Sequence, residues 1–160
     1  MHGIPDVIYG IGVDVLQVVR IERTLKRFGP HFLDRLLLPA EREQLARTAR
    51  PERFVAMRFA AKEAVVKAMG TGFAHGMWIR DVGIVQDRWG KPEIIYSARA
   101  ERLRRKLGIG AGHVTLTDEA GLVVAVAVLM AAPAAPARSA RHAAVRRGAR
   151  RAPRGKARKS

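Results

Sequence analysis

The chain has 160 residues and a hydrophobic content of 48%, enough for one globular domain with a buried core. It contains no cysteine, which excludes a disulfide framework and a cysteine-based zinc site. The formal net charge is +16, and the last thirty residues carry most of the excess, with ten Lys/Arg and no Asp/Glu.

Composition divides the chain into a domain, residues 1–130, and a basic tail, residues 131–160. The tail is rich in Ala, Pro and Arg, and Val145 is its single large aliphatic side chain. We predict that the tail is disordered, because so little apolar surface cannot offset the entropy of ordering. Such a tail either binds nucleic acid and other polyanions non-specifically or has no selected partner.

No segment predicts export or membrane insertion. The first six residues lack a basic n-region, and the apolar stretch 121–135 is shorter than a membrane span and contains Pro133. We therefore expect a cytoplasmic protein that does not enter the membrane.

The first predicted elements are a strand over residues 7–13, which ends at Asp14, and a helix over residues 15–28. Asp14 is therefore either a functional carboxylate or the N-cap of this helix. Three arginines form a stripe on one face of the helix: Arg20, Arg23 and Arg27. Such a stripe is either solvated or a docking surface for an acidic protein.

Two shorter helices, over residues 31–38 and 39–50, precede a long central helix from about residue 52 to residue 69. Its apolar face should enter the core, and Glu63 and Lys67 lie nearly opposite. Small side chains surround the carboxylate, namely Ala56, Ala60 and Ala64. We interpret this strip as open to a bulky ligand, although Glu63 and Lys67 also fit an ordinary ion pair at i,i+4.

The second half of the chain predicts a hairpin, with strands over residues 82–86 and 93–97, and then a helix over residues 98–107. A glycine-containing loop at 108–112 and two more strands, over 113–118 and 122–130, complete the domain. This order of elements is typical of an α+β domain, and we expect a small antiparallel sheet packed with helices.

Asp14 and Glu63 are carboxylates from separate elements, and together they suit a hard cation such as Mg²⁺. This ion takes one or two protein carboxylates and completes its shell with water and phosphate oxygens. Lys62, Lys67 and the backbone N–H groups of Gly70-Thr71-Gly72 favour a phosphate ligand. The two glycines are also a common helix C-cap. Taken together, these features predict a magnesium–phosphate site.

Five motifs occur in order along the chain: Gly10-Ile11-Gly12-Val13-Asp14; Arg58-Phe59-Ala60-Ala61-Lys62-Glu63-Ala64, followed by Lys67; Gly70-Thr71-Gly72; Gly90-Lys91-Pro92; and His113-Val114-Thr115. From about Tyr9 to Met130 the chain resembles the holo-[acyl-carrier-protein] synthases, the short stand-alone branch of the 4′-phosphopantetheinyl transferases. The resemblance implies the fold of that family, and it does not include the tail.

The resemblance implies a transferase that moves 4′-phosphopantetheine from coenzyme A to a serine of apo acyl carrier protein and releases adenosine 3′,5′-bisphosphate. Asp14 and Glu63 would hold Mg²⁺ against the pyrophosphate of the coenzyme. Glu63 would also accept the serine proton, directly or through a water on the metal, and Lys67 would neutralise charge on the leaving phosphate. The nucleophile belongs to the partner, which agrees with the absence of a Ser/His or Cys/His arrangement in this chain.

By the same resemblance, the phosphates and the pantetheine arm would be contacted by Lys62, Gly70, Thr71 and Gly72. The nucleotide end would be lined by Arg58, Lys91, Pro92, His113 and Thr115. The stripe of Arg20, Arg23 and Arg27 would dock the acidic carrier protein, with Arg20 the best-matched residue. The family forms homotrimers with sites between subunits, and its default acceptor is the carrier protein of fatty acid biosynthesis.

Two other classes of function stay open. One is a nucleic-acid-binding protein that acts through the tail, and it predicts that removal of residues 131–160 abolishes function. The other is a non-catalytic module of the same fold that binds carrier proteins, and it predicts that Glu63→Gln leaves function intact. The transferase hypothesis predicts the opposite result in both experiments.

Overall fold

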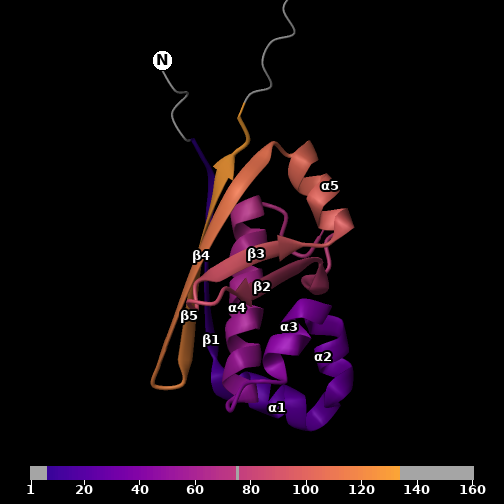
Figure 1. The fold of residues 1–160 in the computed structure, drawn as a ribbon, viewed down its shortest axis with the longest axis vertical. Coiled ribbons are helices and arrows are strands. Elements are labelled where there is room, and N and C mark those ends of the chain that lie inside the picture. The colour runs from indigo at the N-terminus through magenta and orange to yellow at the C-terminus, as the bar shows by residue number, and fades with distance from the viewer. Residues whose placement is uncertain (1–6, 75, 134–160) are drawn as a thin grey trace, which may run out of the picture.

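A three-stranded antiparallel sheet and one long helix form the frame of the molecule (Figure 1). The structure is a computed structural model, and it describes residues 7–74 and 76–133. The sheet contains β1 (Ile8–Gln17), β5 (Leu122–Ala131) and β4 (Ile109–Glu119), in that spatial order. The helix α4 (Pro51–Met69) lies against one face of this sheet. The prediction of an α+β fold with a small antiparallel sheet is confirmed. The predicted disorder of the tail concerns residues that lie almost wholly outside the described ones.

β1 lies directly on α4 because two glycines of the strand face the helix. A Cβ atom at Gly12 would overlap the carbonyl oxygen of Ala64, and one at Gly10 would overlap that of Ala68. Ala56, Ala60 and Ala64 are fully buried. The alanine strip, which we predicted to admit a ligand, is therefore part of the core, and the protein's own strand covers it at Ala64.

β1 is longer than predicted, and it reaches Gln17, which pairs with Leu122 of β5. The helix α1 (Val18–Phe28) starts only after it, with Gln17 as the N-cap residue. Asp14 therefore lies inside a strand, and its interpretation as a helix N-cap is wrong. The strand continues because its side chains alternate between the two faces of the sheet: Asp14 and Leu16 point toward α4, whereas Val13 and Val15 point outward. This alternation extends as far as the start of the helical pattern.

Two short helices with proline in the first turn follow α1: α2 (Pro30–Leu36) and α3 (Pro39–Leu45). α3 ends at Leu45, earlier than predicted, and the residue before Pro51 is not helical, since Arg50 has φ −130° and ψ 73°. After α4 come the 3₁₀ turn η1 (Ile79–Asp81), the hairpin strands β2 (Val82–Gln86) and β3 (Pro92–Tyr96), and α5 (Ala98–Lys106).

β4 starts at Ile109, so most of the predicted glycine loop at 108–112 is strand. The glycines there allow close packing, since a Cβ atom at Gly112 would lie 2.7 Å from the side chain of Leu129 and 2.9 Å from that of Ile94. β2 and β3 form a separate two-stranded sheet, and β3 contacts β4 near this point.

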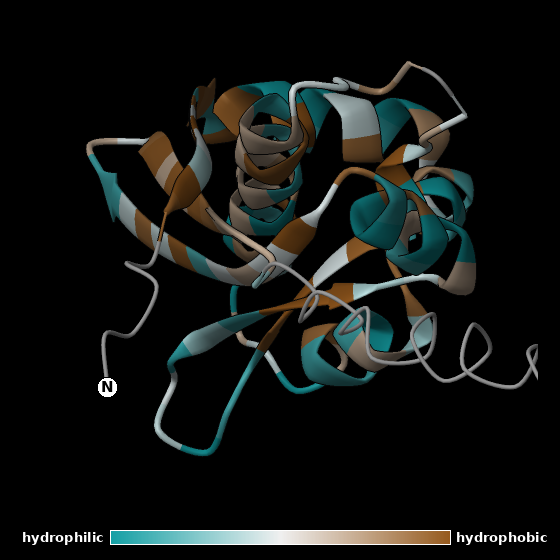
Figure 2. Ribbon diagram, turned by 90° about the horizontal axis from the view of Figure 1, so that it is seen from above, coloured by the Kyte–Doolittle hydropathy of each residue, from teal (hydrophilic) through white to brown (hydrophobic). Residues whose placement is uncertain are grey.

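The core lies between the three-stranded sheet, α4 and the small hairpin. Figure 2 views α4 nearly end-on and shows hydrophobic strand segments beside it. The fully buried side chains include Val55, Val65, Val66, Val82, Ile84, Val123 and Leu129. None of the helices formed by the described residues is both long and apolar enough to cross a membrane.

The outer face of the three-stranded sheet carries exposed apolar side chains. The strand register places them in three rows: Ile11–Val128–His113, Val13–Val126–Thr115 and Val15–Val124–Thr117. On β1 these side chains are 59% (Ile11), 48% (Val13) and 56% (Val15) exposed. A contiguous apolar surface of this kind is typical of an interaction site.

Candidate active site

Asp14, Glu63 and Lys67 come together where β1 crosses α4. The Nζ atom of Lys67 donates to Asp14 Oδ1 at 2.8 Å and to the carbonyl oxygen of Val13 at 3.0 Å. The Lys67 side chain is 49% exposed and that of Asp14 is 15% exposed. Lys67 thus pairs across elements with Asp14, and no ion pair of Lys67 with Glu63 is present among the described residues. The ordinary i,i+4 interpretation of Glu63 and Lys67 is therefore wrong.

The electrostatics of Glu63 reflect a crowded pair of carboxylates. Burial raises the pKa of Glu63, the nearby Asp14 carboxylate raises it further, and Lys67 lowers it. A divalent cation between two such carboxylates would relieve their repulsion. The described residues contain no group of three or more His, Asp or Glu side chains that could hold a metal ion. Two carboxylates fit Mg²⁺, which completes its shell with water and ligand oxygens.

The Gly70-Thr71-Gly72 segment closes α4. Gly70 has a left-handed conformation, with φ 73°, and its N–H donates to the carbonyl oxygen of Lys67 at 3.0 Å. The N–H groups of Thr71 and Gly72 donate to the carbonyl oxygen of Val66. The helix C-cap interpretation is confirmed, and these N–H groups are not the free phosphate donors that we expected. The Thr71 hydroxyl is buried without a hydrogen-bond partner among the described residues, so in this segment it is the group that is able to form a further hydrogen bond.

Lys62 lies in the core, away from the surface of the site. Neither Lys62 nor Glu41 has any exposed side-chain surface, and Lys62 Nζ donates to Glu41 Oε2 at 2.7 Å. Lys62 also donates to the Leu36 carbonyl, and Glu41 accepts from the N–H groups of Leu38 and Ile84. Burial lowers the pKa of Lys62, and the Glu41 carboxylate raises it. The structure thus departs from the predicted phosphate contact, because the ammonium joins α4 to the α2–α3 connection.

Arg58 is also buried, with 1% of its surface exposed. Its guanidinium lies 4.1 Å from the centre of the Phe54 ring and donates to Gln44 Oε1 at 3.2 Å. Burial lowers the pKa of Arg58 to about 10, and Glu41 raises it. Gln44 and Phe54 line a cavity of about 470 Å³. Arg58 was predicted to line a nucleotide-binding surface. In the structure it is buried behind Gln44 and Phe54, which line the cavity in its place.

Glu41 was not among the functional or structural residues identified from the sequence. Its charge is balanced by Lys62, a residue 21 positions later in the chain. The one local interaction that fixes Glu41 is a capping hydrogen bond, in which the N–H of Leu38 donates to Glu41 Oε2 at 2.8 Å.

Lys91, Pro92 and His113 share a cavity of about 290 Å³ between β3 and β4. Thr115 lies in the outer row with Val13 and Val126 and is not among the residues that line this cavity. His113 is on β4, at one edge of the sheet and on its outer face, whereas Asp14 is on β1, at the other edge and on the α4 face. One chain therefore does not bring the two predicted halves of the site together.

Arg20, Arg23 and Arg27 are all exposed on α1, as the predicted stripe requires. No acidic partner of these arginines occurs among the ion pairs of the described residues. The exposed side chains of Val19 and Phe28 lie on the same helix, and the Arg27 guanidinium lies 5.0 Å from the Phe28 ring. α1 thus presents a cationic surface with apolar contacts, which suits an acidic protein partner.

Comparisons with known proteins show the family to which the chain is similar. The family model of the 4′-phosphopantetheinyl transferase superfamily matches residues 10–127, a range that contains all the predicted site residues. The holo-[acyl-carrier-protein] synthase of Geobacter sp. is 40% identical over 122 residues, which is 76% of this chain and 98% of that protein. The crystal structure of the Neisseria meningitidis holo-[acyl-carrier-protein] synthase matches with a TM-score of 0.73 and 38% identity, over 77% of this chain and 98% of that one. The Helicobacter pylori enzyme in complex with coenzyme A matches with a TM-score of 0.66 and 29% identity, over 74% and 98% of the two chains.

Proposed function

Because the chain belongs to the 4′-phosphopantetheinyl transferase superfamily, we propose that it transfers 4′-phosphopantetheine from coenzyme A to a serine of apo acyl carrier protein. The convergence of Asp14, Glu63 and Lys67 at one surface site carries this proposal. In the reaction, the serine oxygen forms a bond to the phosphorus that bears the pantetheine. The P–O bond to the nucleotide breaks, and adenosine 3′,5′-bisphosphate leaves with the electron pair.

Asp14 and Glu63 would hold Mg²⁺, which as a bound ion would supply Lewis-acid stabilisation of the pyrophosphate charge. Lys67 places its ammonium beside Asp14, with half of its surface open, where it would neutralise charge on the leaving phosphate. Glu63 is the one carboxylate of the site without an ion-pair partner among the described residues, so it is the group available to accept the serine proton.

The acceptor would reach this site by docking on α1. Carrier proteins of this kind are acidic by the family resemblance, and Arg20, Arg23 and Arg27 are exposed. Salt should weaken the encounter, since charge steering fades beyond a Debye length of about 8 Å at physiological ionic strength.

A homotrimer would complete the site. The support for it is the exposed apolar face of the sheet, together with the separation of Asp14 and His113 on opposite edges and faces. Contact between sheets of neighbouring chains would bury Ile11, Val13 and Val15 and would set the Lys91–His113 cavity of one chain near the Asp14 site of the next.

The direct test is mass spectrometry of an apo carrier protein incubated with this protein, coenzyme A and magnesium. We expect a mass gain of one phosphopantetheine that EDTA abolishes. Asp14→Asn and Glu63→Gln should each lower turnover by about two orders of magnitude or more while circular dichroism stays unchanged. Glu43→Gln, at an exposed carboxylate of α3, is the matched control and should keep full activity. Full activity of both site variants would overturn the assignment, and it would favour a module that only binds carrier proteins.

A further inference from the structure

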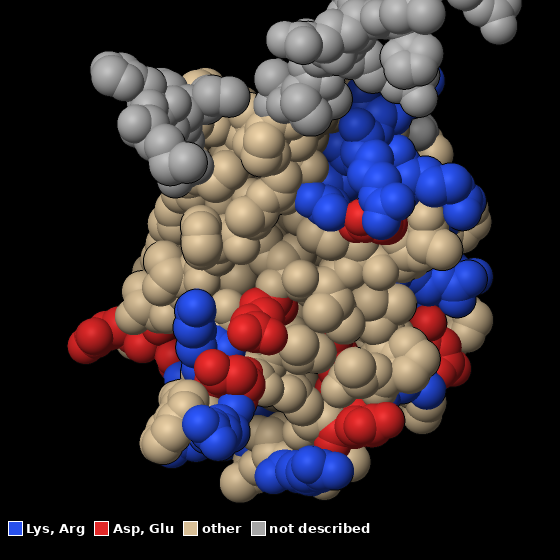
Figure 3. All heavy atoms as spheres, turned by 45° about the horizontal axis from the view of Figure 1, so that its top comes forward, with Lys and Arg blue, Asp and Glu red and all other residues tan. Residues whose placement is uncertain are grey.

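α5 and η1 form the most cationic part of the described molecule outside α1. Together they hold six Lys/Arg side chains and two acidic ones, Asp81 and Glu101. Figure 3 shows a broad basic area, interrupted by one acidic patch, at the end of the molecule where α5 lies. None of these residues belongs to the proposed transferase site.

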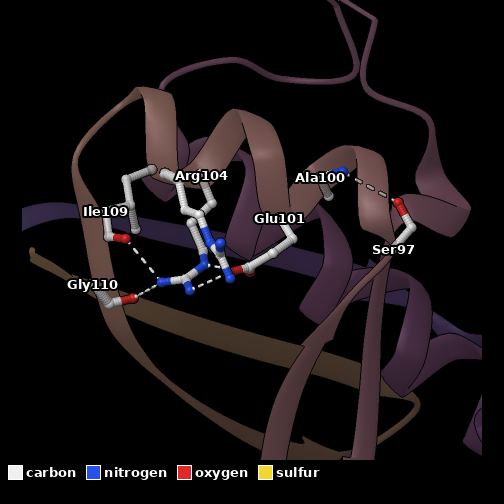
Figure 4. Close-up of polar contacts among 7 residues, drawn as sticks. Ser97, Ala100, Glu101, Arg104, Ile109 and Gly110 are labelled. Carbon is white, nitrogen blue, oxygen red and sulfur yellow. Dashed lines mark hydrogen bonds and ion pairs between the residues drawn. The ribbon is translucent and has the colours of Figure 1, made fainter.

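Part of this charge is engaged in the fold. Arg104 pairs with Glu101 and donates to the carbonyl oxygens of Ile109 and Gly110 at 2.8 and 2.5 Å, which fixes α5 to the start of β4 (Figure 4). Arg105 pairs with the same Glu101 at 2.8 Å. These two arginines are therefore engaged in the fold, and they share a single carboxylate, which leaves one positive charge unbalanced.

Three further cations have no such use. Arg80, Arg102 and Lys106 form no ion pair within the part of the chain that the structure describes. Arg102 and Lys106 lie one turn apart on the same side of α5, and Arg99 continues this line at i−3. Arg99 pairs with Asp81 at 2.6 Å and keeps 45% of its side chain exposed. The result is an exposed cationic stripe along one side of the helix.

The stripe borders a cavity of about 930 Å³ between α5 and the α2–α3 connection. Four arginines line it, namely Arg42, Arg80, Arg99 and Arg102. Two of them are paired with the two acids of the cavity: Arg42 with Asp34 and Arg99 with Asp81. Two positive charges are therefore left over at the cavity wall. An anionic ligand fits this cavity, since its neutralisation requires no displacement of an existing ion pair.

Trp78 stands beside the same stripe. Its side chain is 60% exposed, and the Arg99 guanidinium lies 5.5 Å from the centre of its ring. An exposed indole beside an exposed cationic stripe is the combination that proteins use for single-stranded nucleic acid, in which bases stack and phosphates pair.

We propose that the α5 surface, defined as Trp78, Arg80, Arg99, Arg102 and Lys106, binds single-stranded nucleic acid. A lipid bilayer is a poorer fit, because a flat surface cannot enter the cavity that Arg80 and Arg102 line. The acidic carrier protein is also a poorer fit, because its proposed docking helix, α1, lies at the opposite end of the molecule (Figure 1). This binding is independent of the proposed transfer reaction.

The test is fluorescence anisotropy of a labelled oligoribonucleotide of about 20 nucleotides, titrated with the full chain at several salt concentrations. We expect a Kd of about 1–100 µM near physiological salt. Arg102→Gln/Lys106→Gln should weaken binding about tenfold and reduce the slope of log K against log salt by about 1.4. Trp78→Ala should weaken binding with an unchanged slope, because it removes stacking and no charge.

The matched control is Arg23→Gln/Arg27→Gln, which removes the same charge from α1. It should keep oligonucleotide affinity and lose turnover with the carrier protein, whereas Arg102→Gln/Lys106→Gln should keep turnover. The proposal is overturned by equal losses in both double variants, by no binding at about 100 µM, by loss of turnover in the α5 variant, or by binding to anionic vesicles in place of the oligonucleotide.

Discussion

Lys62 and Glu41 form an ion pair that has no contact with solvent on either side. Such a pair costs little when both charges are replaced by apolar groups, but removal of one charge leaves the other buried and uncompensated. The carboxylate here is fully used, since it accepts from two backbone N–H groups and from Lys62. We therefore assign the pair to the architecture of α4 and not to ligand binding.

This assignment predicts that the effects of the two single substitutions on stability are not additive. Lys62→Met and Glu41→Leu should each lower the free energy of unfolding by about 3–5 kcal/mol, and the double variant should lose clearly less than the sum. Chemical denaturation measures these changes. Lys67→Met is the control, because it should leave the free energy of unfolding nearly unchanged while turnover falls by about 10²-fold. A Lys62→Met protein of normal stability with weakened coenzyme binding would contradict the assignment.

Asp81 is a second buried acid, with 4% of its surface exposed. Burial alone raises its pKa, but hydrogen bonds from the Ser97 hydroxyl and the Trp78 N–H, together with Arg99, lower the pKa below its usual value. A depressed native pKa contributes stability above the unfolded pKa, and that contribution is lost as the pH falls through the native value.

The difference in unfolding free energy between the parent and Asp81→Asn should therefore be largest near pH 7. It should shrink below about pH 4, as the Asp81 carboxyl takes up a proton in the unfolded chain and then in the native one. Thermal unfolding from pH 7 to pH 2.5 measures this difference, with the exposed Glu43→Gln as control. A difference that stays constant over the whole range would show that Asp81 contributes no charge-dependent stability.

At the scale of elements, β1 and α4 were predictable from their local patterns, but their contact was not. The alanines of α4 indicated that something approaches the helix, whereas the pattern of β1 predicted only a strand. Neither pattern names its partner, so the two were not matched to each other. The end of β1 was misplaced for a related reason: Val15 and Leu16 fit both a strand and the first turn of a helix.

The same limit applies to the predicted site. Asp14, Glu63 and Lys67 were predicted to act together from the chemistry of a magnesium–phosphate site and from the family resemblance, and the structure brings them together. Lys62 belongs to the same motif, yet its role depends on Glu41, which lies in another helix and has no sequence signal that names Lys62. The backbone N–H groups of Gly70-Thr71-Gly72 depend on how the helix closes, which composition alone does not decide.

Because glycines of β1 contact the backbone of α4, the addition of one methyl group at Gly12 should strongly affect both stability and turnover. Gly12→Ala would push the strand away from the Ala64 carbonyl, at a cost of about 1–3 kcal/mol or more. It should also lower turnover beyond the loss of folded protein, because Asp14 would move relative to Lys67. Thermal unfolding and turnover, measured on the folded fraction, separate the two effects. Gly121→Ala, at a hairpin position with open space around it, should lose stability through its φ of 77° but keep turnover.

At the scale of the whole molecule, the outer face of the sheet and the divided site lead to one prediction. If neighbouring chains complete each other's sites, Glu63→Gln and His113→Ala should damage different halves of the same site. A mixture of the two variants, unfolded and refolded together, should regain a substantial fraction of parental turnover in assemblies that contain intact pairs. Sedimentation should show a trimer for both variants.

Val13→Lys serves as the control for assembly, since it places a charge on the exposed apolar face without a change to the residues that contact α4. It should shift the protein toward monomer and abolish the regained turnover. Recovery that is no greater than the sum of the separate variants would argue for a site built within one chain.

The position of β1 at the border of its sheet has a practical consequence for handling the protein. A border strand leaves one row of backbone donors and acceptors ready to pair with any other extended chain. If the proposed trimer covers that row, chains that separate at low concentration would expose it together with the valines beside it, and irregular pairing would compete with correct reassembly. We therefore expect activity lost on extreme dilution to return only partly on reconcentration, and light scattering should detect the aggregated remainder.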